Sequence, residues 1–401
     1  MKLNFSDIVC SFSYGLDSIE AQIKAINHGH AKRVAVLCYF LGKHAKMSEK
    51  QLMELIAMAC LHDNALTQYL REEQNEKTGQ ENIAKMMKGH CMIGEENISR
   101  LPFSKAVKNA ILYHHEEANG KGPFGKTSKD TPVMAQFIHM ADVLDIKFKL
   151  DTIDSEKYNA ICEYVRQNTG IRFSEYCTEL FLEKVELEEL KTLQKASLNE
   201  YLNNLSEKKE REFSEAEIRE ICNFWIKIID YKSSFTKSHS REIAKKAEHL
   251  GRYYGFDDEK CLALYVAGTV HDLGKLTTDS SILEKPDKLS EEEFKHIQNH
   301  AYQSWVMLKD VRGLEKITLW AVNHHEKLNG EGYPFGKKGE ELSFEERMMA
   351  CIDIYQALTE ERPYKKGFSH DKTIEIMRDM AAKNMLDGTI VEDIYQCWSV
   401  A

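Results

Sequence analysis

The sequence carries one ordered set of histidines and aspartates twice. Each set consists of a single His, an adjacent His-Asp, another single His, a His-His pair and a final Asp. The set in the second half of the chain comprises His239, His271, Asp272, His300, His324, His325 and Asp353. The set in the first half comprises His30, His62, Asp63, His90, His114, His115 and Asp142. Corresponding members lie 209 to 211 residues apart, which identifies an internal duplication.

These residue types are metal ligands. Imidazole nitrogens and carboxylate oxygens suit Fe, Mn, Zn or Ni, and neither set contains a thiolate. Five histidines and two aspartates exceed the needs of one ion. Each set therefore predicts two divalent metals bridged by a carboxylate, an arrangement that recurs in phosphoester hydrolases. The other histidines have no counterpart at this spacing and are predicted to be structural: His28, His44, His139, His249, His296 and His370.

A longer peptide surrounds each His-His pair. Residues 324–336 read HHEKLNGEGYPFG, and residues 114–125 read HHEEANGKGPFG. The earlier copy has no counterpart of Tyr333. Glycine permits unusual backbone angles and proline stiffens a turn, so each peptide predicts a shaped loop beside the histidine pair. Without the preceding HHE, a plain connection would be the better interpretation.

With HDLGK at residues 271–275 and RPYKK at 362–366, the second half resembles an HD-GYP domain. This branch of the HD superfamily hydrolyses cyclic dinucleotides such as cyclic di-GMP. The resemblance extends from about residue 230 to about residue 395. It implies that the second set of seven residues binds the metals and that Asp272 bridges them. It also implies that the substrate is contacted by Lys275, Gly332, Tyr333, Pro334, Arg362 and Lys365.

Physical chemistry supports some of the roles that the resemblance implies. If His271 and Lys275 lie on one helix, four residues apart, they share a face, and the ammonium points into the metal site. There it can neutralise charge that develops on the phosphoryl oxygens during attack by a metal-bridging hydroxide, with Asp272 and Lys275 as the catalytic residues. Arg362 can fork to a phosphate or a guanine edge. The structural alternatives are a solvated helix face for Lys275 and a surface ion pair with Glu360 or Glu361 for Arg362.

The first copy keeps all seven presumed ligands but lacks the residues that would contact a substrate. HDLGK has become HDNAL, which places Leu66 where the lysine stands in the second copy. No RPYKK follows Asp142. We therefore expect a metal-binding HD domain that is regulatory, dimerising or of different specificity.

In the second copy, Phe235 stands where one family variant has a glutamate that binds a third metal. This difference favours two metals and a linear dinucleotide product.

Helical patterns dominate the elements that must position these residues. Ser48, Ser214 and Ser290 each precede Gln or Glu by three residues, which predicts capping-box helix starts. No glycine or proline occurs between Gly170 and Gly251, and residues 182–213 are rich in Leu, Glu and Lys. We predict an all-α chain with HD-type domains over residues 1–205 and 206–401, joined by a long helical linker that also favours a homodimer.

Composition restricts the class of function. The net charge of −10 argues against DNA binding, and no apolar run is long enough to span a membrane. Ten cysteines without a CxxC pair, and the absence of a signal peptide, predict a cytoplasmic protein.

The leading hypothesis is a phosphodiesterase for cyclic di-GMP that uses two divalent metals, Fe or Mn first and Ni or Zn second. The alternatives are a 3′3′-cyclic GMP-AMP phosphodiesterase and a non-catalytic cyclic-dinucleotide-binding signalling module. A di-iron oxygenase or a nucleotide monophosphohydrolase would not predict the GYP loop or RPYKK.

Overall fold

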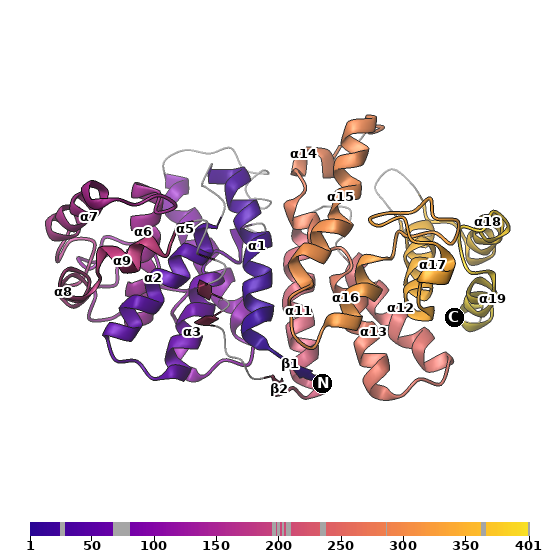
Figure 1. Ribbon diagram of the computed structural model, residues 1–401, viewed down its shortest axis with the longest axis horizontal. Helices are drawn as coiled ribbons and strands as arrows, with labels where there is room; N and C mark the ends of the chain where they lie inside the picture. The colour runs from indigo at the N-terminus through magenta and orange to yellow at the C-terminus, as the bar shows by residue number, and fades with distance from the viewer. Residues whose placement is uncertain are drawn as a thin grey trace. The chain divides into compact units, whose positions relative to one another are not determined.

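The computed structural model of the 401-residue chain is built from helices, with one short two-stranded ribbon in its described part (Figure 1). The structure describes residues 1–24, 29–66, 81–194, 198, 201–202, 204–205, 210–232, 238–285, 287–361 and 366–399. They form two compact units, one of residues 4–210 and one of residues 1–3 and 211–401. The all-α prediction is confirmed. The domain limits 1–205 and 206–401 stay predictions, because residues 206–209 lie outside the described part.

The first unit is assembled from helices that begin at polar caps. Ser48 accepts a hydrogen bond from the Gln51 amide in a complete capping box, and Asp154 and Ser174 cap two further helices. The described elements are α1 (Phe5–Lys24), α2 (His30–His44), α3 (Glu49–Cys60), α5 (Glu81–Ile98), η1 (Lys105–Val107), α6 (Val133–Phe148), α7 (Ser155–Gln167), α8 (Glu175–Lys184) and α9 (Leu187–Lys191).

The second unit repeats this plan and also includes the N-terminus of the chain. Strands β1 (Lys2–Leu3) and β2 (Arg211–Glu212) pair antiparallel, and the Met1 carbonyl accepts a hydrogen bond from the Phe213 amide. The helices are α11 (Glu215–Lys232), α12 (His239–Tyr253), α13 (Asp258–Val270), η3 (Leu273–Thr277), α14 (Ser280–Leu283), α15 (Glu291–Leu308), α16 (Glu315–Val322), η4 (Gly339–Glu341), α17 (Phe344–Thr359), α18 (His370–Ala382) and α19 (Gly388–Trp398).

Equivalent glycines allow equivalent helix pairs to pack closely. A Cβ on Gly42 of α2 would meet the side chains of Leu52 and Leu55 on α3, 2.8 and 3.0 Å away. A Cβ on Gly251 of α12 would lie 2.8 Å from Leu264 on α13. The α2–α3 and α12–α13 pairs form the centre of each core, where Leu55 and Leu264 are fully buried. The two glycines lie 209 residues apart, so the duplication has kept this close helix packing.

The segment 182–213, predicted to be a connecting helix or helix pair, is interrupted, because Val185 is extended between α8 and α9, and residues 211–212 form β2. Val185 is buried, and its β-branched side chain favours an extended backbone. The homodimer that this helix favoured stays a prediction. The expectation that Lys275 of HDLGK shares an α-helix with His271 was wrong, because α13 ends at Val270 and Lys275 lies in η3.

In the described residues, no helix is both long and apolar enough to cross a membrane.

Candidate metal centres

Helix ends and tight turns place the second set of ligands. His239 opens α12, His271 and Asp272 lie in the turn after α13, and His324 and His325 lie in the turn after α16. The remaining two, His300 and Asp353, lie inside α15 and α17. All but His325 are buried. The structure therefore brings together residues that span more than a hundred positions in the sequence.

Asp272 lies between two groups of ligands. Its Oδ2 is 3.1 Å from His271 Nε2 and 3.7 Å from His239 Nε2, and Asp353 Oδ1 is 3.5 Å from the same His239 nitrogen. Its Oδ1 is 3.3 Å from His300 Nε2 and 4.0 Å from His324 Nε2. One carboxylate oxygen thus faces each group, as expected for a carboxylate that bridges two metals.

The donor atoms fit metal ions. His300 and His324 donate from Nδ1 to the carbonyls of Ile297 and Ala321, at 2.7 and 2.6 Å, so each Nε2 carries a lone pair. These two Nε2 atoms face each other at 3.4 Å. Two lone pairs cannot form a hydrogen bond, but nitrogen ligands about 2.1 Å from one tetrahedral ion are separated by about 3.4 Å.

Other contacts complete the orientation of the ligands. His271 Nδ1 donates to the Gly268 carbonyl, and its buried Nε2 makes no hydrogen bond within the described residues. His239 Nδ1 lies 3.2 Å from Glu360 Oε2. Burial lowers the pKa of His325 to about 3, so this ring is neutral near neutral pH. Burial alone would raise the pKa of Asp272, but His271 and Lys275 hold it well below its usual value.

Lys275 reaches the centre by a different route from the one expected. Its Nζ lies 2.6 Å from Asp272 Oδ2, because the 3₁₀ turn after His-Asp folds the side chain back by three residues. Its side chain is 20% exposed and that of His325 is 24% exposed, so the centre opens to solvent on their side. This ammonium is therefore available to an anion that approaches from solvent.

The GYP loop covers His325. The ring of Tyr333 lies 4.6 Å from that of His325, and its amide donates to the His325 carbonyl. Burial raises the pKa of Tyr333 above its usual range, so it stays a neutral phenol. A Cβ at Gly332 would lie 2.5 Å from Glu326 Cα, so only glycine fits beside the HHE peptide. Tyr333 is followed by Pro334 through a cis peptide.

The acid of HHE is a functional residue that sequence reasoning missed. The Glu326 carboxylate accepts hydrogen bonds from the amides of Phe335, Gly336 and Lys337, at 2.7, 3.1 and 3.0 Å. Glu116 accepts equivalent bonds from the amides of Phe124 and Lys126 in the first copy. This residue pins the loop that begins at the histidine pair. Its presence at the same place in both copies was the available signal.

Two predicted substrate contacts, Arg362 and Lys365, lie outside the described residues, as does Phe235. Beside the GYP loop, the described part of the chain has an exposed aromatic cluster. Tyr302 and Trp305 of α15 lie 6.5 and 5.8 Å from Phe335, ring centre to ring centre. Tyr302 and Phe335 are exposed, although aromatic side chains are usually buried.

The first set forms a similar centre in its own unit. Asp63 again lies between two groups, with Oδ2 3.6 Å from His62 Nε2 and Oδ1 3.2 Å from His90 Nε2. His90 and His114 face each other at 3.4 Å between Nε2 atoms, and His30 Nε2 lies 3.2 Å from Asp142. The seventh member, His115, lies 3.9 Å from Asp142. All seven predicted residues therefore converge here as well.

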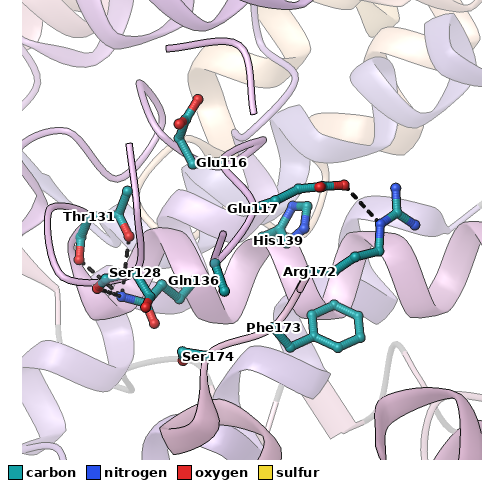
Figure 2. A pocket seen from close by; sticks show the side chains of 10 residues that line it. Glu116, Glu117, Ser128, Thr131, Gln136, His139, Arg172, Phe173 and Ser174 are labelled. Carbon is teal, nitrogen blue, oxygen red and sulfur yellow. Dashed lines mark hydrogen bonds and ion pairs between the residues drawn. The ribbon is translucent and has the colours of Figure 1, made fainter. Parts of the chain in front are cut away.

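The surroundings of this first centre differ. Leu66, in place of the lysine, is only 2% exposed and adds no charge. His139 on α6 is buried and donates from Nδ1 to the His114 carbonyl, so it supports a ligand rather than binding metal. Figure 2 shows His139 beside Glu117, Arg172 and Phe173 in a pocket with room for about one water molecule, about 10 Å³. The pocket therefore belongs to the support of the histidine pair.

Comparison with known proteins matches both halves of the chain to one family. HD-domain family models match residues 27–147 and 223–390. A 3′3′-cGAMP-specific phosphodiesterase of Vibrio cholerae is 30% identical over 400 residues, which cover 94% of this chain and 88% of that protein. The chain belongs to the HD-GYP family of cyclic-dinucleotide phosphodiesterases. It is thus a hydrolase with a duplicated HD domain.

Two further relatives differ in how much of this HD-GYP protein they match. A cyclic di-GMP phosphodiesterase of Pseudomonas aeruginosa is 34% identical over 160 residues, which cover 39% of each chain. A crystal structure of a cyclic GMP-AMP-specific phosphodiesterase from V. cholerae superposes with a TM-score of 0.72 over 100% of this chain and 99% of that one. At 21% identity, this likeness supports the fold of the whole chain.

Proposed function

We propose that the C-terminal centre hydrolyses 3′3′-cyclic GMP-AMP. The observation that carries the proposal is the 3′3′-cGAMP-specific relative, which aligns with 94% of this chain and so includes both HD domains. The cyclic di-GMP phosphodiesterase of P. aeruginosa aligns with 39%. The motifs of the second half alone favoured cyclic di-GMP. The extent of the alignment now favours the alternative substrate.

In this proposal, two divalent metals, Fe or Mn, would be held by His239, His271, Asp272, His300, His324, His325 and Asp353. Metals in these positions would supply Lewis acidity and a nucleophilic hydroxide. The chain's own residues do the rest. Lys275, which lies against Asp272, turns its ammonium toward the phosphoryl oxygens, where negative charge grows. The ring of Tyr333 lies against that of His325 and would orient it.

The aromatic cluster would bind a base. A cyclic dinucleotide extends well beyond the phosphate under attack, and each purine offers a flat face for stacking. Tyr302, Trp305 and Phe335 lie beside the GYP loop, and each stacked base is worth about 1–3 kcal/mol. Arg362 and Lys365 are proposed to grip the remainder of the dinucleotide. Without a third metal, the product is the linear dinucleotide.

The N-terminal domain is proposed to be regulatory rather than catalytic, because Leu66 replaces the lysine and the first copy has no counterpart of Tyr333. The compartment is proposed to be the cytoplasm. All ten cysteines are free thiols, and most of them are buried, which suits reducing conditions.

The test is turnover of 3′3′-cGAMP and cyclic di-GMP by anaerobically purified protein reconstituted with Fe(II) or Mn(II). Products are separated by chromatography, and metal content is measured in parallel. We expect faster hydrolysis of 3′3′-cGAMP, about two metals in the C-terminal centre and no turnover by Asp272→Ala. Faster cyclic di-GMP hydrolysis would overturn the substrate assignment alone. Binding of both dinucleotides without hydrolysis would overturn catalysis and favour the signalling module.

A further inference from the structure

The N-terminal centre is approached by two additional side chains that have metal-binding chemistry. Cys91 follows His90 on α5 and is fully buried. It groups with His90, His114 and His115 within the distances expected of ligands to one ion. Glu20 of α1 is 1% exposed and groups in the same way with His30 and His62. Neither side chain belongs to the duplicated set.

The position of Cys91 suits a shared ion. Its Sγ lies 3.8 Å from His90 Nε2. A thiolate at about 2.3 Å and an imidazole at about 2.1 Å from one tetrahedral zinc are about 3.6 Å apart. At the duplication spacing of 210 residues, the C-terminal counterpart is Ala301. The C-terminal centre therefore has no thiol at this place.

Charge makes the same distinction between the two centres. Asp63, Asp142, Glu20 and a Cys91 thiolate carry four negative charges, which neutralise two divalent cations. Asp272, Asp353 and Glu360, which lies against His239, carry three, and Lys275 offsets one of them, so two divalent cations would leave the C-terminal centre with two positive charges. An anionic phosphodiester is attracted to the second centre and not to the first. Burying Glu20 and Cys91 as anions is stable only beside cations.

We propose that Cys91 and Glu20 are ligands of the N-terminal centre, which is a closed, zinc-selective structural site rather than a second phosphodiesterase site. Metal binding releases the Cys91 thiol proton to solvent and forms the sulfur–metal bond. A soft thiolate favours zinc over the Fe or Mn proposed for the other centre. Saturation by protein atoms is what separates structural from catalytic zinc sites. The proposal does not depend on which dinucleotide is hydrolysed.

Cobalt substitution tests the thiolate directly. The full chain is stripped of metal, reloaded anaerobically with Co(II), and its near-ultraviolet absorption is recorded. The seven C-terminal ligands include no cysteine, so a thiolate-to-cobalt charge-transfer band reports on the N-terminal centre alone. We expect the band in the wild type and in the control Cys162→Ala, and its loss in Cys91→Ala. Ala is the residue at the equivalent C-terminal position, so this variant is expected to fold. A band that is absent from the wild type, or that persists in Cys91→Ala, overturns the thiolate ligand.

Zinc retention tests the carboxylate. Zn(II)-loaded wild type, Glu20→Gln and the control Glu54→Gln are exposed to EDTA, and the zinc left on the chain is followed with time. Glu54 is another buried acid of the unit, bonded to Ser104. Removal of an outer-shell partner of a metal ligand lowers metal affinity about 10- to 100-fold. We expect Glu20→Gln to lower the zinc affinity of the N-terminal centre by at least this factor. Glu54→Gln should retain zinc like the wild type. Equal retention by all three removes Glu20 from the ligand set.

Discussion

The hydrogen bonds between Glu326 and the GYP loop allow a quantitative prediction. Glu326→Ala removes the acceptor for three backbone amides. The freed amides belong to an exposed part of the loop and can turn to water, so each lost bond costs about 1 kcal/mol net. The ordered loop is therefore destabilised by about 3 kcal/mol. If the transition state needs the ordered loop, kcat/KM falls about 150-fold.

The matched control is Glu116→Ala, which removes the equivalent acceptor from the N-terminal loop. We expect its dinucleotide turnover to stay within about threefold of the wild type. Steady-state kinetics, metal content and thermal unfolding are measured for both variants. The reasoning is refuted if Glu326→Ala keeps kcat/KM within about threefold of the wild type. It is also refuted if that variant loses activity only because it loses metal or unfolds.

Three further predictions concern the two centres and the aromatic cluster. Lys275→Met should lower kcat about 10²- to 10³-fold, which is the effect of removing one preorganised donor, and should leave the metal content unchanged. A change confined to KM would contradict the role of Lys275 at the phosphoryl group. Asp63→Ala should remove the N-terminal metals but leave dinucleotide turnover largely intact, as metal analysis and kinetics would record; total loss of turnover would show that the first copy is indispensable. Trp305→Leu should raise KM for 3′3′-cGAMP, through the loss of about 1–3 kcal/mol of stacking, while hydrolysis of bis(p-nitrophenyl) phosphate stays unchanged; equal effects on both substrates would exclude base stacking.

The sequence alone predicted which residues converge in the proposed C-terminal metal centre and that a related set exists in the first half. The constant spacing of about 210 residues between the two copies made this possible, because a duplication preserves spacing whatever the fold. The capping boxes at Ser48 and Ser290 were also legible, since a cap involves residues only three apart. The helical class followed from the same short-range patterns.

Only the tertiary structure decided how these residues act together. Lys275 reaches Asp272 through a 3₁₀ turn because the chain leaves α13 at the His-Asp pair, and helical spacing could not show that exit. Glu20 and Cys91 belong to no duplicated motif; α1 brings Glu20 beside His30 and His62, and α5 carries Cys91 next to His90. Spacing along the chain records ancestry and local structure, whereas the placement of a side chain from another helix, such as Glu20, is specified only by packing.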